Sequence, residues 1–255
     1  MSKRAVFLEV DGLEIAGEIY IPEDAKMVSR PTLCLCHGIP AVPPDPNDRG
    51  YPILAGKFRA AGMVTMLFNF RGTGGSGGNL DILGWARDLK AVIDYLYSLR
   101  EVDRDHLSLM GFSGGAAVAA YVASQDPRVS SIVTCACPAE FSFLTNVEQP
   151  QSIIEHFRHI GVIRDNDFPP SIDQWLGGFD QISPINWVDK IAPRPLLLIH
   201  GEQDELVNVS HAWALYEKAG QPKEIAIIDG AEHRIRHDEK AMATALNWLM
   251  RRSSI

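Results

Sequence analysis

The chain lacks any apolar stretch long enough to cross a bilayer, because glycine, proline or a charged residue interrupts each apolar run after a few residues. Its first residues, MSKRAVFLEVDG, also lack the apolar stretch and small-residue cleavage site of a signal peptide, since the segment becomes acidic at Glu9 and Asp11. These two absences predict a cytoplasmic protein that does not insert into a membrane.

Basic residues are too few to give the protein a positively charged surface. Lys and Arg number 24 against 32 Asp and Glu, which gives a formal net charge of −8. Nucleic acids and anionic membranes both require a basic surface, so the composition argues against either as a partner. We expect a small molecule as the partner, and a monomer or homodimer as the assembly.

Cysteine is scarce and its spacing does not favour a metal site. The four cysteines form two pairs, Cys34 with Cys36 and Cys135 with Cys137, each with one residue between its members. On a strand this spacing places both side chains on one face, whereas a zinc ribbon requires two intervening residues. Reduced, buried cysteines are therefore expected.

Four residues in the middle of the chain are further candidates for metal ligands. A solvated helix face is the favoured interpretation of the two histidines among them, so no metal is predicted. The members are His156 and His159, together with Asp165 or Asp167.

Repeats, low-complexity tracts and linkers are also absent, and 255 residues suffice for one large core, so a single domain over 1–255 is expected. The first 22 residues alternate apolar and polar side chains about Asp11-Gly12, which predicts an antiparallel hairpin. After the hairpin, short apolar runs alternate with segments of helical period. Strands are predicted over 32–36, 63–70, 106–112, 129–136, 195–201 and 224–230, and helices over about 50–61, 85–99, 113–123, 210–219 and 238–251.

This alternation predicts an α/β fold: a mainly parallel, eight-stranded sheet with helices on both faces and the hairpin at one edge. The segment from about 138 to 184 breaks the pattern. It has no clear strand, is rich in aromatic residues, Pro and Gly, and contains two possible short helices, near 148–160 and 171–177. Such a long connection is unusual unless it is functional, so we interpret it as a small helical cap inserted over the carboxyl edge of the sheet, where ligands bind in open α/β folds.

The sequence Gly111-Phe112-Ser113-Gly114-Gly115 fits the pattern G-x-S-x-G. It follows an apolar strand and opens a helix of small residues, which is the strand–turn–helix context of a nucleophile elbow. Glycines are needed because the serine occupies a strained turn where strand and helix backbones approach closely. The alternative is a Gly/Ser-rich turn that caps a helix.

A serine hydroxyl needs a base to activate it and an acid to orient that base. His233 is the predicted base, because it follows a strand in the loop before the last helix. Asp204 is the predicted acid, because it lies in the loop after the preceding strand. Other residues remain possible: His237 as base, and Glu202, Glu205 or Asp229 as acid; His37 and His200 are interpreted as structural or core residues.

An oxyanion hole requires two backbone N–H groups. Gly114 follows the nucleophile and supplies one. The loop after strand 32–36 reads His37-Gly38-Ile39-Pro40, and Pro40 has no N–H, so Ile39 is the predicted second donor.

Taken in order, the segments CLCHGIP, NFRGTGGSGG, GFSGG, HGEQDELV and GAEHRIR resemble those of the α/β-hydrolase superfamily. The segment 69–76 is similar to a loop of the prolyl oligopeptidase and dienelactone hydrolase groups. The resemblance implies acyl transfer to water through an acyl-enzyme, without a metal or organic cofactor. Two departures matter: Ser113 stands where dienelactone hydrolases use cysteine, and the absence of a preceding β-propeller argues against an oligopeptidase.

The expected function is hydrolysis of a small to medium carboxylic ester. Alternatives are hydrolysis of an amide, thioester or carbon–carbon bond, or a non-catalytic ligand receptor on the same fold, because fold alone does not set function. Aromatic residues of the predicted cap either form its own core or line the substrate pocket. The candidates for the pocket are Phe141, Phe143, Phe168, Trp175 and Phe179.

Overall fold

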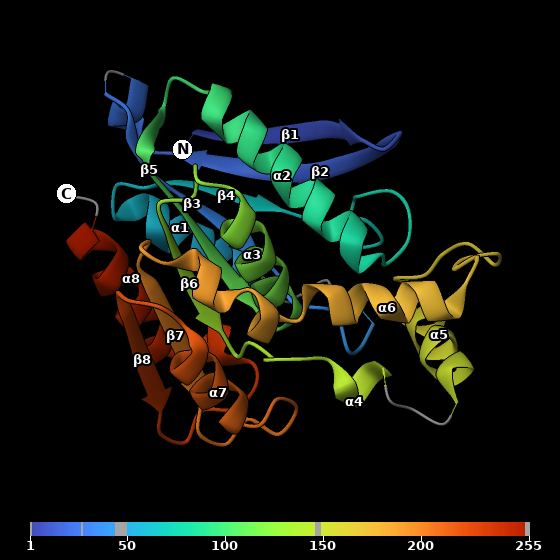
Figure 1. Ribbon diagram of the computed structural model, residues 1–255. Helices are drawn as coiled ribbons and strands as arrows, with labels where there is room; N and C mark the ends of the chain where they lie inside the picture. Colours follow the sequence, from blue (N-terminus) through green and yellow to red (C-terminus); the bar gives the residue numbers. More distant parts are fainter. Residues whose placement is uncertain (1, 27, 44–49, 146–148, 253–255) are drawn as a thin grey trace.

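A computed structural model describes residues 2–26, 28–43, 50–145 and 149–252 of the chain (Figure 1). Eight strands form one sheet in the order β1-β2-β4-β3-β5-β6-β7-β8. The strands are β1 (Ser2–Val10), β2 (Leu13–Ile21), β3 (Arg30–Cys36), β4 (Val64–Phe68), β5 (Val102–Phe112), β6 (Ser131–Cys135), β7 (Leu196–Gly201) and β8 (Lys223–Ile228). The predicted α/β sheet of eight strands is confirmed.

The hairpin at one edge follows from its turn. Asp11 and Gly12 both have positive φ, 54° and 76°, the combination that a two-residue hairpin turn requires and that Asp-Gly favours. Strand β2 then pairs antiparallel with β4, whereas β3, β4, β5, β6, β7 and β8 run parallel to one another. All carboxyl ends of these six strands therefore lie at one edge of the sheet.

Helices cover both faces of the sheet, as the alternation of elements predicts. Helices α2 (Ile82–Ser98), α3 (Gly114–Gln125) and α7 (Ser210–Lys218) contribute apolar side chains to one core cluster. Helices α1 (Gly50–Ala60) and α8 (Glu239–Arg252) contribute to a second. Within the described residues, no helix combines the length and apolar character needed to cross a membrane.

The four cysteines are buried and free of disulfides. Cys34 and Cys36 point into the same core cluster, as expected for alternate residues of a strand. The expectation is wrong for the second pair, because Cys135 lies in one cluster and Cys137 in the other. Strand β6 ends at Cys135, and Ala136 has a φ of 50°, so the alternation of faces is interrupted between the two cysteines.

The segment between β6 and β7 is helical. It contains α4 (Ser142–Thr145), α5 (Pro150–His159) and α6 (Ile172–Ile182), followed by short 3-10 helices at Pro184–Asn186 and Val188–Ile191. Helix α6 lies against the start of α2, and α5 extends beyond it, away from the sheet (Figure 1). The Trp175 indole donates a 2.7 Å hydrogen bond to the Leu80 carbonyl, which fastens α6 to the segment before α2.

Candidate active site

Ser113 occupies a strained turn between β5 and α3. Its φ of 50° and ψ of −126° lie outside the regions that residues other than glycine commonly adopt. The Ser113 N–H donates a 2.8 Å hydrogen bond to the Cys135 carbonyl at the end of the neighbouring strand, which helps to hold this conformation. The hydroxyl therefore leaves the backbone at the carboxyl edge of the sheet.

The glycines on either side are required by close backbone packing. A Cβ at Gly111 would overlap the backbone of Ala116, and one at Gly115 would overlap the carbonyl of His37. Strand β5, helix α3 and the loop after β3 thus converge on Ser113 with no space for larger residues. This steric convergence accounts for the G-x-S-x-G pattern here.

His233 and Asp204 approach Ser113 from two other loops at the same edge. The Nε2 of His233 lies 3.1 Å from the Oγ of Ser113, and its Nδ1 lies 2.9 Å from both carboxylate oxygens of Asp204. Because a carboxylate accepts, Nδ1 carries the proton and the lone pair of Nε2 faces the hydroxyl. The three residues predicted from sequence are therefore joined in one hydrogen-bonded chain.

The Asp204 carboxylate is fully buried. Burial alone raises its pKa, but hydrogen bonds from His200, His233 and the Val207 N–H outweigh burial and hold the pKa of Asp204 well below its usual range. Its Oδ1 accepts from the N–H groups of Leu206 and Val207 at 3.0 and 2.8 Å. The group therefore remains a carboxylate at neutral pH, which is the form that orients an imidazole.

The loop with Ile39 is held beside the start of α3. A Cβ on Gly114 would lie 2.7 Å from Ile39 Cγ1 and 3.6 Å from the Ile39 nitrogen. The buried His37 ring fastens this loop: Nδ1 donates to the Gly38 carbonyl at 2.8 Å, and Nε2 accepts from the Phe70 N–H at 3.1 Å. Burial lowers the pKa of His37 to about 4, so this crosslink uses a neutral imidazole.

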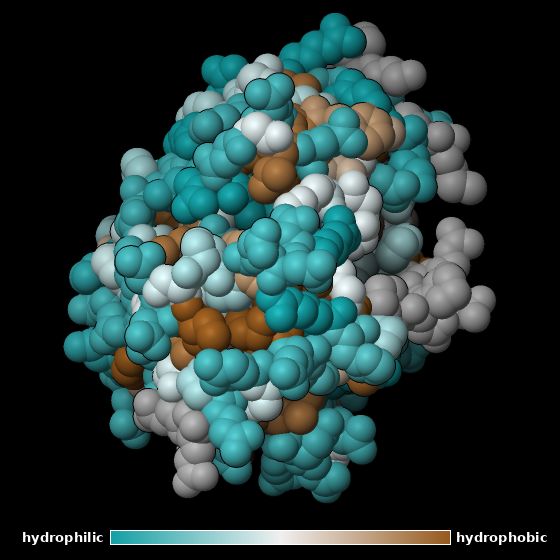
Figure 2. All heavy atoms as spheres, turned by 90° about the vertical axis from the view of Figure 1, so that its right-hand side faces the viewer, coloured by the Kyte–Doolittle hydropathy of each residue, from teal (hydrophilic) through white to brown (hydrophobic). Residues whose placement is uncertain are grey.

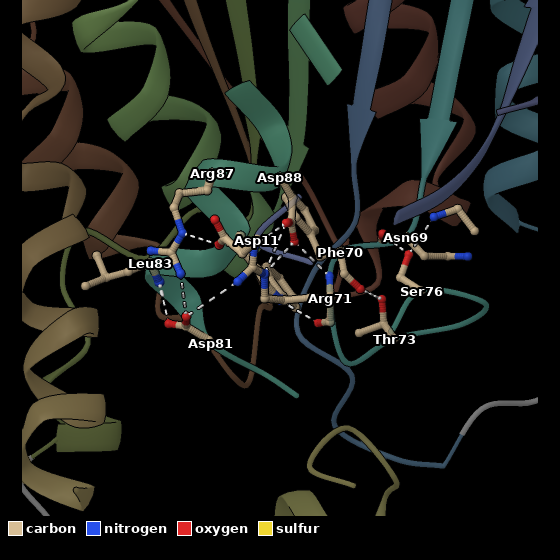
Figure 3. A network of polar contacts seen from close by, with 12 residues as sticks. Asp11, Asn69, Phe70, Arg71, Thr73, Ser76, Asp81, Leu83, Arg87 and Asp88 are labelled. Atoms are coloured by element: carbon tan, nitrogen blue, oxygen red, sulfur yellow. Dashed lines mark hydrogen bonds and ion pairs between the residues drawn. The ribbon is translucent and has the colours of Figure 1, made fainter. Parts of the chain in front are cut away.

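A network of charged residues holds the loop that follows β4 (Figure 3). The buried Arg71 guanidinium donates to both Asp88 oxygens, with a shortest distance of 2.7 Å, and to Asp11 at 2.9 Å. Arg71 thus joins the hairpin turn, this loop and α2, while the indole of Trp85 donates to the Arg71 carbonyl. The same loop supplies the Phe70 N–H that holds His37.

The other carboxylates and histidines considered from sequence lie elsewhere. Glu205 is exposed and accepts a 3.4 Å hydrogen bond from the His233 N–H. Glu202 and Asp229 are also exposed. His237 lies in a short 3-10 helix after the His233 loop. His200 was interpreted as a possible core residue, yet its Nε2 lies 3.2 Å from the Asp204 carboxylate. The only sequence signal for that contact is a histidine at a strand end, four residues before the acid.

The candidate pocket residues lie in the helical segment. Phe141, Trp175 and Phe179 are buried and stacked edge to face, with Phe179 5.4 Å from Phe141 and 5.1 Å from Trp175 between ring centroids. Half-buried Phe168 lines a hollow between α5 and the segment 166–172. The side chain of Phe143 lies outside the described residues.

The end of the molecule that carries α5 and α6 is mostly hydrophilic, with an apolar patch in the lower half of the view (Figure 2). His156 and His159 are exposed on α5. In the part of the chain that the structure describes, no cluster of three or more His, Cys, Asp or Glu side chains could hold a metal ion.

The sheet topology and the elbow define an α/β hydrolase, and the chain is a serine hydrolase of this superfamily. Within the superfamily, it belongs to the prolyl oligopeptidase family, whose family model matches residues 55–254.

Individual proteins are also similar to this chain. Protein PA2218 of Pseudomonas aeruginosa is 23% identical in an alignment that covers 91% of this chain and 74% of that protein. The α/β hydrolase GrgF from Penicillium sp. sh18 superimposes with a TM-score of 0.80 over the full length of both chains at 21% identity. Est1E from Butyrivibrio proteoclasticus, solved with ferulic acid bound, has a TM-score of 0.76 at 18% identity and covers 98% of this chain and 99% of its own. At such identities, the structural likeness demonstrates a shared fold.

Proposed function

We propose that the protein is a serine esterase that hydrolyses a small to medium carboxylic ester through an acyl-enzyme. The observation that carries this proposal is the continuous hydrogen-bonded chain from Ser113 Oγ to His233 to the buried Asp204 carboxylate. A hydroxyl, an imidazole in the required tautomer and an ionised acid are the groups that this chemistry needs. Their order in the sequence, Ser113, Asp204 and His233, is the α/β-hydrolase order.

The proposed mechanism uses these groups in turn. Ser113 Oγ attacks the ester carbonyl carbon while His233 Nε2 takes the hydroxyl proton, and the carbonyl oxygen becomes an oxyanion. The N–H groups of Ile39 and Gly114 donate to that oxyanion. As the tetrahedral intermediate collapses, the bond to the alcohol breaks and the alcohol leaves with the proton from His233. A water then attacks the acyl-enzyme by the same route and releases the acid and Ser113.

The substrate class is proposed from the site's surroundings and from similar proteins. The segment 138–184 leaves the carboxyl end of β6 and is rich in aromatic residues, and we propose that it acts as a cap over the ester. Half-buried Phe168 is the proposed contact for an apolar acyl or alcohol group. We propose that Phe141, Trp175 and Phe179, which are buried, support the cap from within its core. Est1E, which shares the fold, was solved with the aromatic acid ferulic acid, and this supports an ester with an aromatic or apolar part.

Amide hydrolysis is the second candidate, because the family to which the chain belongs is named for an oligopeptidase. Esters and amides pass through the same tetrahedral intermediate, but an amine leaves only after it is protonated, so a site can cleave one class far faster than the other. A panel of p-nitrophenyl esters, p-nitroanilides and thioesters with graded acyl groups would rank the two classes. We expect the highest kcat/KM for an ester.

Labelling by a fluorophosphonate probe tests the nucleophile directly. The wild-type protein should be labelled at Ser113 and should hydrolyse p-nitrophenyl esters, because His233 activates that hydroxyl. Ser113→Ala should lose labelling and lower kcat by about 10⁴-fold or more, with an unchanged circular dichroism spectrum. Ser98→Ala, at the exposed end of α2, serves as the matched control and should behave like the wild type. A folded wild-type protein that neither reacts with the probe nor turns over any ester would instead be a ligand receptor.

A further inference from the structure

A second histidine contacts the far side of the acid. His200 lies near the end of β7 and is 1% exposed. Its Nε2 lies 2.8 Å from the Val207 carbonyl oxygen and 3.2 Å from Asp204 Oδ2. Because both neighbours are acceptors, Nε2 must carry a proton, and His200 is a donor shared between them. It does not contact Ser113 Oγ, so it has no part in proton transfer from the serine.

The hydrogen bonds to Asp204 show what this donor contributes. Oδ1 accepts two backbone N–H groups, from Leu206 and Val207, in addition to His233. Among the residues that the structure describes, Oδ2 faces two side chains: it accepts from His233 Nδ1 at 2.9 Å and lies 3.2 Å from His200 Nε2. Without His200, one oxygen of a fully buried carboxylate would depend on His233 for its hydrogen bonds. The terminal torsion of a carboxylate is a soft, broad well, so a second contact on Oδ2 restricts its rotation more than His233 alone would.

We propose that His200 is a positioning residue that holds the Asp204 carboxylate, and through it the His233 ring, in the orientation that Ser113 requires. The inference rests on the proposed esterase function and adds a fourth member behind the chain of three. The bond from His200 to the Val207 carbonyl supports the same role, because it ties the turn 204–207 to β7. His200 thus contacts both the first and the last residue of the turn, Asp204 and Val207.

The charged and titratable groups around His200 come from three elements. Asp204 lies on the adjoining loop, and His233 lies beyond it on the loop after β8. His211, on α7, is close enough to interact electrostatically with both His200 and Asp204. His211 Nδ1 accepts the Ala139 N–H at 3.0 Å, and burial lowers the pKa of His211, so it faces His200 as a neutral ring at neutral pH. The negative charge next to His200 is therefore that of Asp204.

Two substitutions separate positioning from simple packing. His200→Leu fills a similar space without a donor, and His200→Gln keeps an amide N–H near the position of imidazole Nε2. We expect His200→Leu to lower kcat for a p-nitrophenyl ester by about tenfold, with KM changed by less than about twofold, because substrate does not contact this residue. In the profile of kcat/KM against pH, the acid limb of His200→Leu should move to higher pH. The Asp204 carboxylate has lost the His200 donor in this variant, so it favours the imidazolium form of His233. His200→Gln should recover most of both properties.

Proton NMR of the free protein gives a readout that does not need turnover. The Nδ1–H of His233, bonded to a carboxylate, should give a low-field resonance in the wild type and in His200→Gln. It should shift or broaden in His200→Leu. Circular dichroism and urea unfolding establish that each protein is folded, and His200→Asn, whose shorter amide falls short of Asp204 Oδ2, replaces His200→Leu if that protein does not fold.

The outcomes are distinct. If His200→Leu has the same kcat, pH profile and NMR resonance as the wild type, the inference is overturned and the esterase proposal stands. Equal losses in the donor-free and His200→Gln proteins, in step with lower stability, would also overturn it, because they would indicate packing alone. If the wild type hydrolyses no ester, the proposed function fails, and the NMR comparison still decides whether His200 holds Asp204.

Discussion

Four histidines lie close to the site, and they differ in which ring nitrogen donates a hydrogen bond and which accepts one. His37 and His233 donate from Nδ1, to a carbonyl and to a carboxylate. His200 donates from Nε2, and His211 accepts at Nδ1. At the scale of single residues, these partners determine which nitrogen holds a proton, and therefore which ring can act as a base. Of the four, His233 is the one with Nε2 within hydrogen-bond distance of the Ser113 hydroxyl.

The role of Asp204 can be tested by removing its charge alone. Asp204→Asn should lower kcat by about 10⁴-fold, because an amide can hold the imidazole in the wrong tautomer and cannot stabilise the imidazolium. Glu205→Gln is the matched control, since that carboxylate contacts His233 only through its backbone N–H at 3.4 Å. Ester turnover of both variants provides the measurement. An Asp204→Asn protein with kcat within about tenfold of the wild type would assign the acid to another group.

Because His37 is buried, we expect the free energy of unfolding to depend on pH. Its pKa is lowered from 6.5 to about 4 by burial, so the native state binds fewer protons than the unfolded state between these values. The stability that its neutral form provides is complete above about pH 6.5, declines as the pH falls, and is lost below about pH 4. From pH 7 to pH 5, this single group should cost the wild type about 2 kcal/mol of unfolding free energy.

His37→Gln, which does not titrate, should lack that part of the loss. Urea unfolding of both proteins at the two pH values provides the comparison. The other histidines titrate equally in both proteins and cancel in the difference. Parallel stability curves would show that His37 is not held in its neutral form.

At the scale of elements, the site depends on how closely β5, α3 and the loop after β3 approach one another. Gly115 faces backbone on that loop: a Cβ there would overlap the His37 carbonyl and lie 2.6 Å from the Cys36 carbonyl oxygen. Backbone atoms held by a sheet cannot move aside as a flexible side chain can. The position of Ile39 beside Gly114 follows from the same close approach.

Gly115→Ala should therefore destabilise the protein by about 3 kcal/mol or more, or prevent folding. Gly56→Ala is its matched control, since it also adds one methyl group inside a helix, α1, but meets nothing within 4 Å. There the better helix propensity of alanine should raise stability by up to about 1 kcal/mol. Thermal and urea unfolding measure both changes, and similar effects at the two positions would refute the packing argument.

At the scale of the whole molecule, Arg71 connects parts of the chain that are far apart in sequence. It joins the β1–β2 turn at Asp11, its own loop after β4, and Asp88 on α2 (Figure 3). Arg71 and Asp88 are buried, at 4% and 0% exposure, so the loss of either partner leaves an uncompensated charge in the interior. One network of hydrogen bonds therefore links the hairpin edge, the loop that holds His37, and α2.

Arg71→Met should lower the free energy of unfolding by about 3–5 kcal/mol. Arg87→Met is the matched control: Arg87 also pairs with Asp11 and with Asp81, but its side chain is 47% exposed, so its loss should cost about 0–1 kcal/mol. Urea unfolding at neutral pH measures both. Comparable losses of unfolding free energy for the two variants would show that burial does not make the Arg71–Asp88 pair more important for stability.

Local patterns in the chain were sufficient for the main elements. The apolar runs 32–36 and 106–112 lie within β3 and β5, and Asp11-Gly12 forms the hairpin turn. The elbow at Ser113 was recognisable because G-x-S-x-G stands between an apolar strand and a helix of small residues. The parallel topology was equally informative about the site, because it brings the loops after β5, β7 and β8 to one edge whatever their distance in sequence.

Tertiary structure decided which side chains meet. The sequence left four acidic candidates open, and the fold directs the carboxylate of Asp204 to His233, since backbone N–H groups of its own turn hold it there. The position of His200 at a strand end, four residues before the acid, did not reveal their contact, because a strand-end histidine looks the same whether it packs or donates. Aromatic residues such as Phe179 became core through contacts across the helical segment. Periodicity reports which face of an element is buried, whereas the partner on that face depends on long-range packing.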